Sequence, residues 1–137
     1  HGPAIDDEVD LIQAGKNYGW PIITWGIDYS GAKIGIGTAK DGLEQPIYYW
    51  KPSIATSGLA FYTGELFPAW KGNAFVGGLG GGHIDRLILD GNTVVQHEKL
   101  LADLGHRIRD VRSGPDGALW VLTDESNGKV LRLTPAI

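Results

Sequence analysis

A repeat with a spacing of about 45 residues is the feature that most constrains the fold of this chain. The segment Lys71-Gly72-Asn73-Ala74-Phe75-Val76 resembles Asp116-Gly117-Ala118-Leu119-Trp120-Val121, which lies 45 positions later. Downstream, Arg86–Leu89 resembles Val130–Leu133, which lies 44 positions later. A period of roughly 40–50 residues with about four strands per unit is typical of β-propeller blades. A β-sandwich, whose strands are also short and evenly spaced, is the alternative. We favour the propeller because the aromatic–valine strand recurs at the same place in each unit.

The remaining sequence also favours many short strands joined by tight turns. Glycine accounts for 21 of the 137 residues, far more than a helical bundle would contain. Helical periodicity is nearly absent, and only Leu100–Leu104 is expected to form a short helical turn. Hydrophobic runs between turn residues predict ten strands: Val9–Ile12, Pro21–Thr24, Ile47–Trp50, Leu59–Tyr62, Ala74–Leu79, Ile84–Leu89, Val94–Leu101, Ile108–Arg112, Leu119–Thr123 and Val130–Leu133.

We therefore predict an all-β chain that forms two to three blades of a six-bladed propeller, with four antiparallel strands in each blade. Residues 1–56 are expected to form an irregular blade with loops, residues 57–101 a blade, and residues 102–137 the last blade. Closed propellers usually need at least four blades. The chain is therefore expected to need the remaining blades or another copy of itself. Because His1 is not a natural start, we also expect it to be cut from something longer.

Composition narrows the class of function. The formal net charge of −4 argues against a nucleic-acid partner, and no apolar run is long enough to span a membrane. There is no cysteine, which excludes disulfides, thiolate metal sites and a cysteine nucleophile. Lack of cysteine is compatible with a periplasmic or secreted location.

The segment Arg107-Ile108-Arg109-Asp110 carries the main chemical signal. Alternation along a strand would place Arg107 and Arg109 on the same face. Two neighbouring guanidiniums repel each other unless an anion lies between them. At a strand end they would form a fork suited to a small, flat ligand with several carboxylates. The structural alternative is that both arginines merely extend to solvent, with Arg112 an ordinary surface or salt-bridge residue.

Several motifs together resemble one family. They are Gly2-Pro3, Asp7-Glu8, Gly15–Pro21, Gly26–Gly31 and Arg107–Gly117. The chain is similar over nearly its whole length to the C-terminal part of the soluble aldose sugar dehydrogenases that depend on pyrroloquinoline quinone (PQQ), the glucose/sorbosone dehydrogenase family. This resemblance implies a six-bladed propeller that carries PQQ and calcium and oxidises the C1 hydroxyl of aldose sugars to lactones.

The resemblance also implies roles for cofactor-binding residues. Arg107 and Arg109 match the arginine pair that grips the carboxylates of PQQ. Tyr29 matches a tyrosine that lines the cofactor pocket, although it could instead be a turn residue that covers the glycine-rich loop. In some relatives a lysine that contacts the cofactor stands where this chain has Gly80, so a backbone amide nest replaces it, or affinity is weaker, or the loop has no ligand role.

Two calcium sites are implied as well. Gly2 and Pro3 match a pair whose backbone carbonyls ligate the catalytic calcium, and calcium prefers such oxygen ligands. Glu8 and the backbone carbonyl of Tyr18 match a second, structural calcium site. The alternatives are an ordinary turn at Gly2-Pro3 and a solvated acidic turn around Glu8.

The family's general base is a histidine in an earlier blade, and none of the four histidines here matches it. No catalytic residue is therefore assigned, and the 137 residues alone are expected to be inactive. A non-catalytic propeller segment for binding or scaffolding is the main alternative function. A calcium-dependent lactonase-like hydrolase is a third, but no converging set of Asn, Asp and Glu residues stands out.

Overall fold

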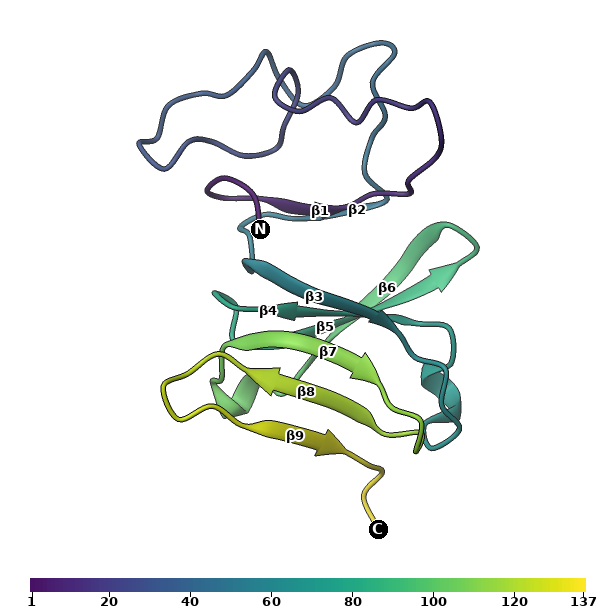
Figure 1. Ribbon diagram of the computed structural model, residues 1–137. Coiled ribbons are helices and arrows are strands. Elements are labelled where there is room, and N and C mark those ends of the chain that lie inside the picture. Colours follow the sequence, from purple (N-terminus) through teal and green to yellow (C-terminus); the bar gives the residue numbers. More distant parts are fainter. The chain divides into compact units, whose positions relative to one another are not determined.

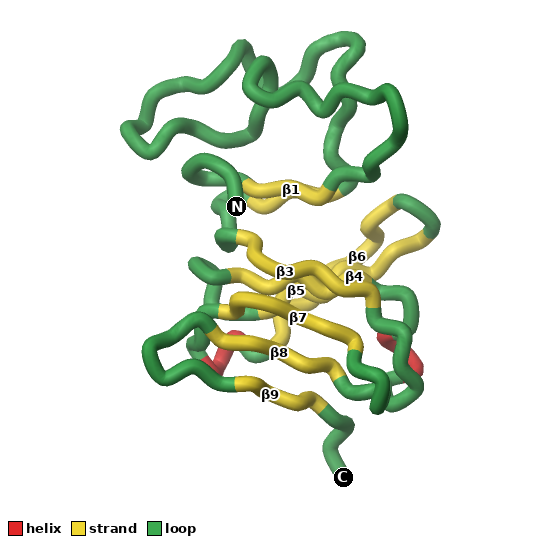
Figure 2. The backbone as a smooth tube through the Cα atoms, viewed as in Figure 1, coloured by secondary structure: helices red, strands yellow, loops and turns green.

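The computed structural model describes all residues, His1–Ile137, and divides into two compact units, His1–Ala55 and Thr56–Ile137. Each unit is described by itself. Figure 1 shows the order of the elements along the chain, and Figure 2 shows that loops dominate the first unit and strands the second. No helix in the structure is long and apolar enough to cross a membrane.

The N-terminal unit contains one short antiparallel pair, β1 (Asp7–Val9) and β2 (Tyr48–Trp50). Asp7 pairs with Trp50 and Val9 with Tyr48. The long segment between these strands is irregular, as its glycine- and proline-rich sequence leads one to expect. Isolated bridges such as Ala4 to Ile27 hold it in place.

The predicted strand at Pro21–Thr24 is wrong. The backbone N–H groups of Ile22 and Ile23 both donate to the carbonyl of Gly19, at 2.6 and 3.0 Å, which makes a turn rather than an extended strand. Pro21 has no N–H to offer a ladder. Only a single parallel bridge, Ile23 to Gly37, remains.

The C-terminal unit contains two antiparallel sheets. The first has the order β3 (Thr56–Phe61), β4 (Ala74–Gly78), β5 (Ile84–Asp90) and β6 (Thr93–Leu100). The second has the order β7 (Ile108–Ser113), β8 (Leu119–Thr123) and β9 (Val130–Leu133). Short 3₁₀ turns, η1 (Pro68–Trp70) and η2 (Ala102–Leu104), lie in the connections. The all-β prediction is therefore confirmed, and the first of these sheets has the expected four strands while the second has three.

The two sheets of this unit share one hydrophobic core. It is built mainly from inward-facing residues of β4, β5, β7 and β8 and comprises Tyr62, Phe75, Ile84, Ile108, Val111, Leu119 and Val121. Each such side chain contributes about 1.5–3 kcal/mol when fully buried. A Cβ on Gly77 would lie 2.7 Å from Cγ2 of Ile108, so glycine at this position allows β4 to approach β7 closely.

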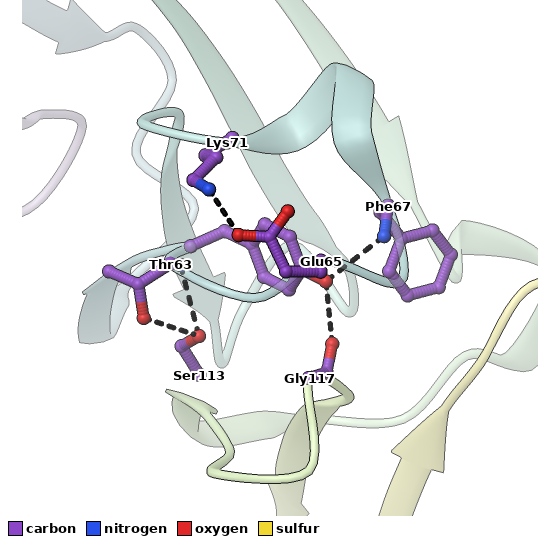
Figure 3. Close-up of polar contacts among 7 residues, drawn as sticks. Thr63, Glu65, Phe67, Lys71, Ser113 and Gly117 are labelled. Atoms are coloured by element: carbon purple, nitrogen blue, oxygen red, sulfur yellow. Dashed lines mark hydrogen bonds and ion pairs between the residues drawn. The ribbon is translucent and has the colours of Figure 1, made fainter.

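Polar contacts join the loops that follow β3 and β7 (Figure 3). The buried Tyr62 hydroxyl donates to the carbonyl of Gly117 at 2.5 Å and accepts from the N–H of Phe67 at 3.0 Å. The N–H of Thr63 donates to Oγ of Ser113 at 3.1 Å. These bonds satisfy backbone groups at the ends of the strands and fix the two sheets against each other.

Candidate functional site

The arginine pair lies where the chain enters β7. Arg107 immediately precedes this strand, and Arg109 is its second residue. The register shifts between Ile108 and Asp110, where β7 pairs with β8, so this end of the strand is irregular. Ile108 points into the core, whereas the side chains of Arg107 and Arg109 are 53% and 49% exposed. Both guanidiniums are therefore available at the surface.

The two guanidiniums converge on one carboxylate. Nη2 of Arg107 lies 3.3 Å and Nη2 of Arg109 lies 3.0 Å from Oδ2 of Asp124. The hydrogen bond from Arg109, followed by that from Arg107, holds the pKa of Asp124 below its usual value. Two neighbouring guanidiniums were expected to have an anion between them, and the carboxylate of Asp124 is such an anion. One positive charge remains in excess over the three groups.

Asp124 is a residue of this cluster that the sequence pattern did not predict. It follows β8 directly, and its N–H donates to the carbonyl of Arg107 at 2.8 Å. Pairing the predicted strands Ile108–Arg112 and Leu119–Thr123 as a hairpin would have brought it beside the arginines, since Ile108 pairs with Thr123. The pairing register of β7 with β8, which the sequence pattern did not give, was the information needed to place Asp124.

Neighbouring charged residues are engaged elsewhere. Arg112 pairs with Asp110 at 3.0 Å, as expected for an ordinary salt-bridge residue. Nδ1 of His106 lies 2.6 Å from Oε1 of Glu125. The arginine pair is thus distinct from the ion pairs around it, because it alone shares a carboxylate between two arginines of the same strand end.

The glycine-rich turn between β4 and β5 packs near the chain that leads to Arg107. A Cβ on Gly82 would lie 3.7 Å from the carbonyl oxygen of His106. Gly80, the position where the family resemblance implies a lysine in some relatives, lies in this turn. His83 is buried, and its Nδ1 lies 2.9 Å from the carbonyl of Gly81.

A cleft of about 710 Å³ in the N-terminal unit brings together four of the residues predicted to bind cofactor or calcium. These are Gly2, Pro3, Glu8 and Tyr29. The hydroxyl of Tyr29 donates to the carbonyl of Gly2 at 3.3 Å, which ties the two predicted sites to each other. The N–H of Gly2 donates to the buried carboxylate of Asp7 and so anchors the Gly2-Pro3 turn. None of the four histidines lines this cleft.

A second, much smaller cavity brings Glu8 and Tyr18 together, with Glu44 and Gln45 on the same lining. The Tyr18 hydroxyl accepts from the N–H of Gln13 at 2.7 Å and donates to the carbonyl of Leu11 at 2.6 Å. These bonds fix the ring of Tyr18 and thereby the position of its backbone.

Carboxylates crowd around Glu8. Burial, together with the charges of Asp10, Asp6 and Asp7, raises the pKa of Glu8 to about 7. Burial also raises the pKa of Asp10, one of whose buried oxygens has no hydrogen-bond partner. The surroundings therefore favour a cation. No three acidic or histidine side chains converge closely enough to hold a metal by themselves. A calcium ion here would need backbone carbonyls and water as further ligands.

The family model described as Glucose / Sorbosone dehydrogenase matches residues 1–132 of the chain. The chain belongs to this family. It is 50% identical over 137 residues to the aldose sugar dehydrogenase YliI of Escherichia coli (strain K12), covering 98% of this chain and 37% of that protein. It is also 44% identical to the uncharacterized protein slr1608 of a Synechocystis strain, covering 97% of this chain and 32% of that protein.

Solved structures support the same relationship. The soluble aldose sugar dehydrogenase of E. coli in its apo-form superposes with a TM-score of 0.93 at 49% identity, covering 99% of this chain and 40% of that one. The PQQ-bound aldose sugar dehydrogenase of Streptomyces coelicolor superposes over 97% of this chain and 37% of that one, with a TM-score of 0.71 at 23% identity. The fold is accordingly that of a fragment of a β-propeller dehydrogenase. The chain spans well under half the length of these relatives.

Proposed function

We propose that this chain is the C-terminal segment of a PQQ- and calcium-dependent sugar dehydrogenase that oxidises the C1 hydroxyl of aldoses to lactones. In this proposal the segment contributes cofactor and calcium contacts and no general base. The observation that carries the proposal is the convergence of Arg107 and Arg109 on one point at the end of β7. The sugar dehydrogenases of the same family supply the activity class.

The arginine pair fits a cofactor that is flat and carries three carboxylates. Each guanidinium has five N–H donors, and Asp124 engages only one nitrogen of each. The remaining N–H groups can donate to a carboxylate in the paired geometry that guanidinium prefers. Tyr29, in the N-terminal unit, stays a predicted cofactor contact through its ring.

The residues assigned to calcium also fit an oxygen-seeking cation. The carbonyls of Gly2 and Pro3 would hold one ion at the cleft, and Glu8 with the carbonyl of Tyr18 would hold a second. When bound, PQQ accepts the two electrons from the sugar, and calcium polarises the group that receives them. The excess of carboxylates around Glu8 supports the second site, because a divalent ion would offset their mutual repulsion.

Proton transfer from the sugar is assigned outside this chain. None of the histidines lies at the cleft, and His106 and His97 are paired with Glu125 and Asp85. The 137 residues alone should therefore give no dye reduction with glucose, PQQ and calcium. Measurable dye reduction would contradict this assignment. An aldose as substrate, the remaining blades or another copy of the chain as partners, and a periplasmic or secreted location stay predictions.

The proposal is tested by titrating PQQ into the calcium-loaded protein and following cofactor absorbance. Charge-assisted hydrogen bonds are worth about 1.5–3 kcal/mol, so Arg107→Ala or Arg109→Ala should each weaken binding roughly 10- to 100-fold. Arg112→Ala is the matched control, because this arginine pairs with Asp110 on the same strand. PQQ binding that is unchanged in both Arg107→Ala and Arg109→Ala would overturn the proposal.

One observation favours the alternative, a propeller segment that only binds or scaffolds. Asp124 already pairs with both arginines, so their presence has a structural explanation without a ligand. In that case PQQ would not bind, and Arg107→Ala would only lower the melting temperature slightly, since exposed ion pairs contribute little.

A further inference from the structure

We infer that Asp124 is a positioning residue, whose carboxylate gathers Arg107 and Arg109 into one anion-binding fork and stays in place when the anion binds. The inference rests on the proposed function for the identity of the anion. It does not rest on it for the ordering of the arginines, which concerns the ligand-free protein.

The backbone around Asp124 is fixed before any ligand arrives. Its own N–H donates to the carbonyl of Arg107 at 2.8 Å. The preceding residue, Thr123, is buried and closes the hairpin to β9: its N–H donates to the carbonyl of Lys129 at 3.0 Å, and its hydroxyl accepts from the N–H of Lys129 at 2.8 Å. The backbone at Asp124 is thus fixed, and its short side chain starts from a defined position beside the two arginines.

The contact with Asp124 offsets the repulsion between the guanidiniums of Arg107 and Arg109. Two guanidiniums on the same side of one strand end repel each other, and each is about half exposed and otherwise free to swing apart. A single oxygen, Oδ2 of Asp124, accepts from both and draws them to one point. Asp110 and Asp116 differ, since their ion pairs with Arg112 and Arg132 each involve one arginine.

The geometry leaves the fork open to a ligand. Only Nη2 of each arginine is engaged, so the Nε and Nη1 donors of both remain for a second carboxylate. With Asp124 in place the cluster keeps one net positive charge. An incoming anion therefore meets a fork that is already converged and does not have to order two long side chains, each of which carries substantial rotamer entropy.

Two explanations of Asp124 predict opposite changes in anion affinity when its carboxylate is removed. If its carboxylate only occupies the arginines, it competes with an anion, and its removal should tighten binding. If it positions them, its removal should weaken binding even though the local positive charge rises. Asp124→Asn and Asp124→Ala separate these cases, and the second should have the larger effect because it also removes the acceptor oxygen.

The experiment uses the intact protein and two readouts. In the first, ¹⁵Nε relaxation of the arginine side chains is measured without cofactor. Arg107 and Arg109 should be ordered in the wild type and mobile in Asp124→Ala. Unchanged order in the variant would overturn the inference whatever PQQ does.

In the second readout PQQ is titrated with calcium present. Asp124→Ala should weaken binding roughly 10- to 100-fold and Asp124→Asn about threefold to tenfold, with Asp124→Glu recovering part of the loss. Glu125→Gln is the matched control: it removes one negative charge from the same hairpin but contacts His106, so binding should stay equal or tighten slightly. Equal or tighter binding in folded Asp124→Ala would overturn the inference. If Arg107→Ala and Arg109→Ala both bind PQQ as well as the wild type, the proposed function fails, while the relaxation result still decides the role of Asp124.

Discussion

The acidic cluster around Glu8 in the N-terminal unit and the carboxylates beside arginines in the C-terminal unit have opposite pKa shifts. In the N-terminal unit, burial and neighbouring acidic charges raise the pKa values of Asp6 and Glu8, and burial raises that of Asp10. In the C-terminal unit, hydrogen bonds from Trp120 and Arg132 lower the pKa of Asp116 to about 2, and the arginine pair lowers that of Asp124. In the first unit the effect of Lys51 on Asp6 does not offset burial and the neighbouring acids, whereas the second unit supplies an arginine for Asp116 and two for Asp124.

The same contrast holds for packing. The C-terminal unit buries a continuous apolar cluster between two sheets. In the N-terminal unit the buried residues include Asp6 and Asp7, and regular structure is limited to two three-residue strands. Hydrophobic burial thus stabilises one unit largely by itself, while the other depends on polar contacts that a cation would complete.

The largest expected effect comes from breaking the core of the C-terminal unit. Phe75 is fully buried, and Phe75→Ala should cost about 3–5 kcal/mol of stability because it leaves a cavity between the sheets. Urea denaturation measures this cost. Phe61→Ala on β3 is the matched control, since Phe61 is 54% exposed and should lose far less. Equal losses would show that the apolar cluster does not hold this unit together.

Calcium should stabilise the N-terminal unit selectively. A ligand present at a hundred times its Kd adds about 2.7 kcal/mol to the state that binds it. Hydrogen exchange should therefore slow in residues 1–55 and not in the second unit when calcium is added. Glu8→Gln should reduce this protection, whereas Glu65→Gln, at an exposed glutamate of the second unit, should leave it intact. Equal protection in the Glu8 variant would contradict calcium binding at Glu8.

Removing one hydroxyl tests the polar link between the two sheets. Tyr62→Phe leaves the carbonyl of Gly117 and the N–H of Phe67 without their partner, which should cost about 1–3 kcal/mol. The shape of the core is retained, so the loss reports on the hydrogen bonds. Denaturation midpoints of Tyr62→Phe and of Tyr49→Phe, a partly exposed tyrosine of β2, make the comparison. If Tyr62→Phe loses no more stability than Tyr49→Phe, packing alone and not these hydrogen bonds joins the two sheets.

The last expected effect is a dependence on pH, which solvent screening reduces because Glu8 is an exposed residue. The folded-state pKa of Glu8 is about 7, above the ordinary value of 4.5, so the folded protein holds a proton that the unfolded chain has already released. Without calcium, the stability of the N-terminal unit should therefore fall as pH rises from about 4.5 to about 7 and level off above that. Melting temperatures in a chelating buffer measure the slope. Glu8→Gln should flatten it, and an unchanged slope would mean that another group titrates.

How much could be predicted from the sequence differs between the two units. In the C-terminal unit the hydrophobic runs between turn residues placed every strand within a few residues, because strands buried between two sheets are rich in apolar residues. In the N-terminal unit the apolar run Pro21–Thr24 suggested a strand, yet its N–H groups bind the carbonyl of Gly19 in a turn. Short runs in loop-rich regions follow turn chemistry more than periodicity.

The residues of the candidate site also differ in how they could be predicted from the sequence. Arg107 and Arg109 could be picked out from the residues themselves, because adjacent like charges need an anion. The family resemblance, and not the residues themselves, assigned roles to Gly2, Pro3, Glu8, Tyr18 and Tyr29. At Gly2, Pro3 and Tyr18 the implied ligand is a backbone carbonyl, which has no sequence signature. Asp124 was not predicted, because its place depends on the register of the hairpin between β7 and β8.

A crystal structure of the intact protein with PQQ and calcium tests the central claim most directly. We expect a cofactor carboxylate within hydrogen-bonding distance of both Arg107 and Arg109, with Asp124 still bound to Nη2 of each. A cofactor held elsewhere, with the two arginines bonded to Asp124 alone, would contradict it.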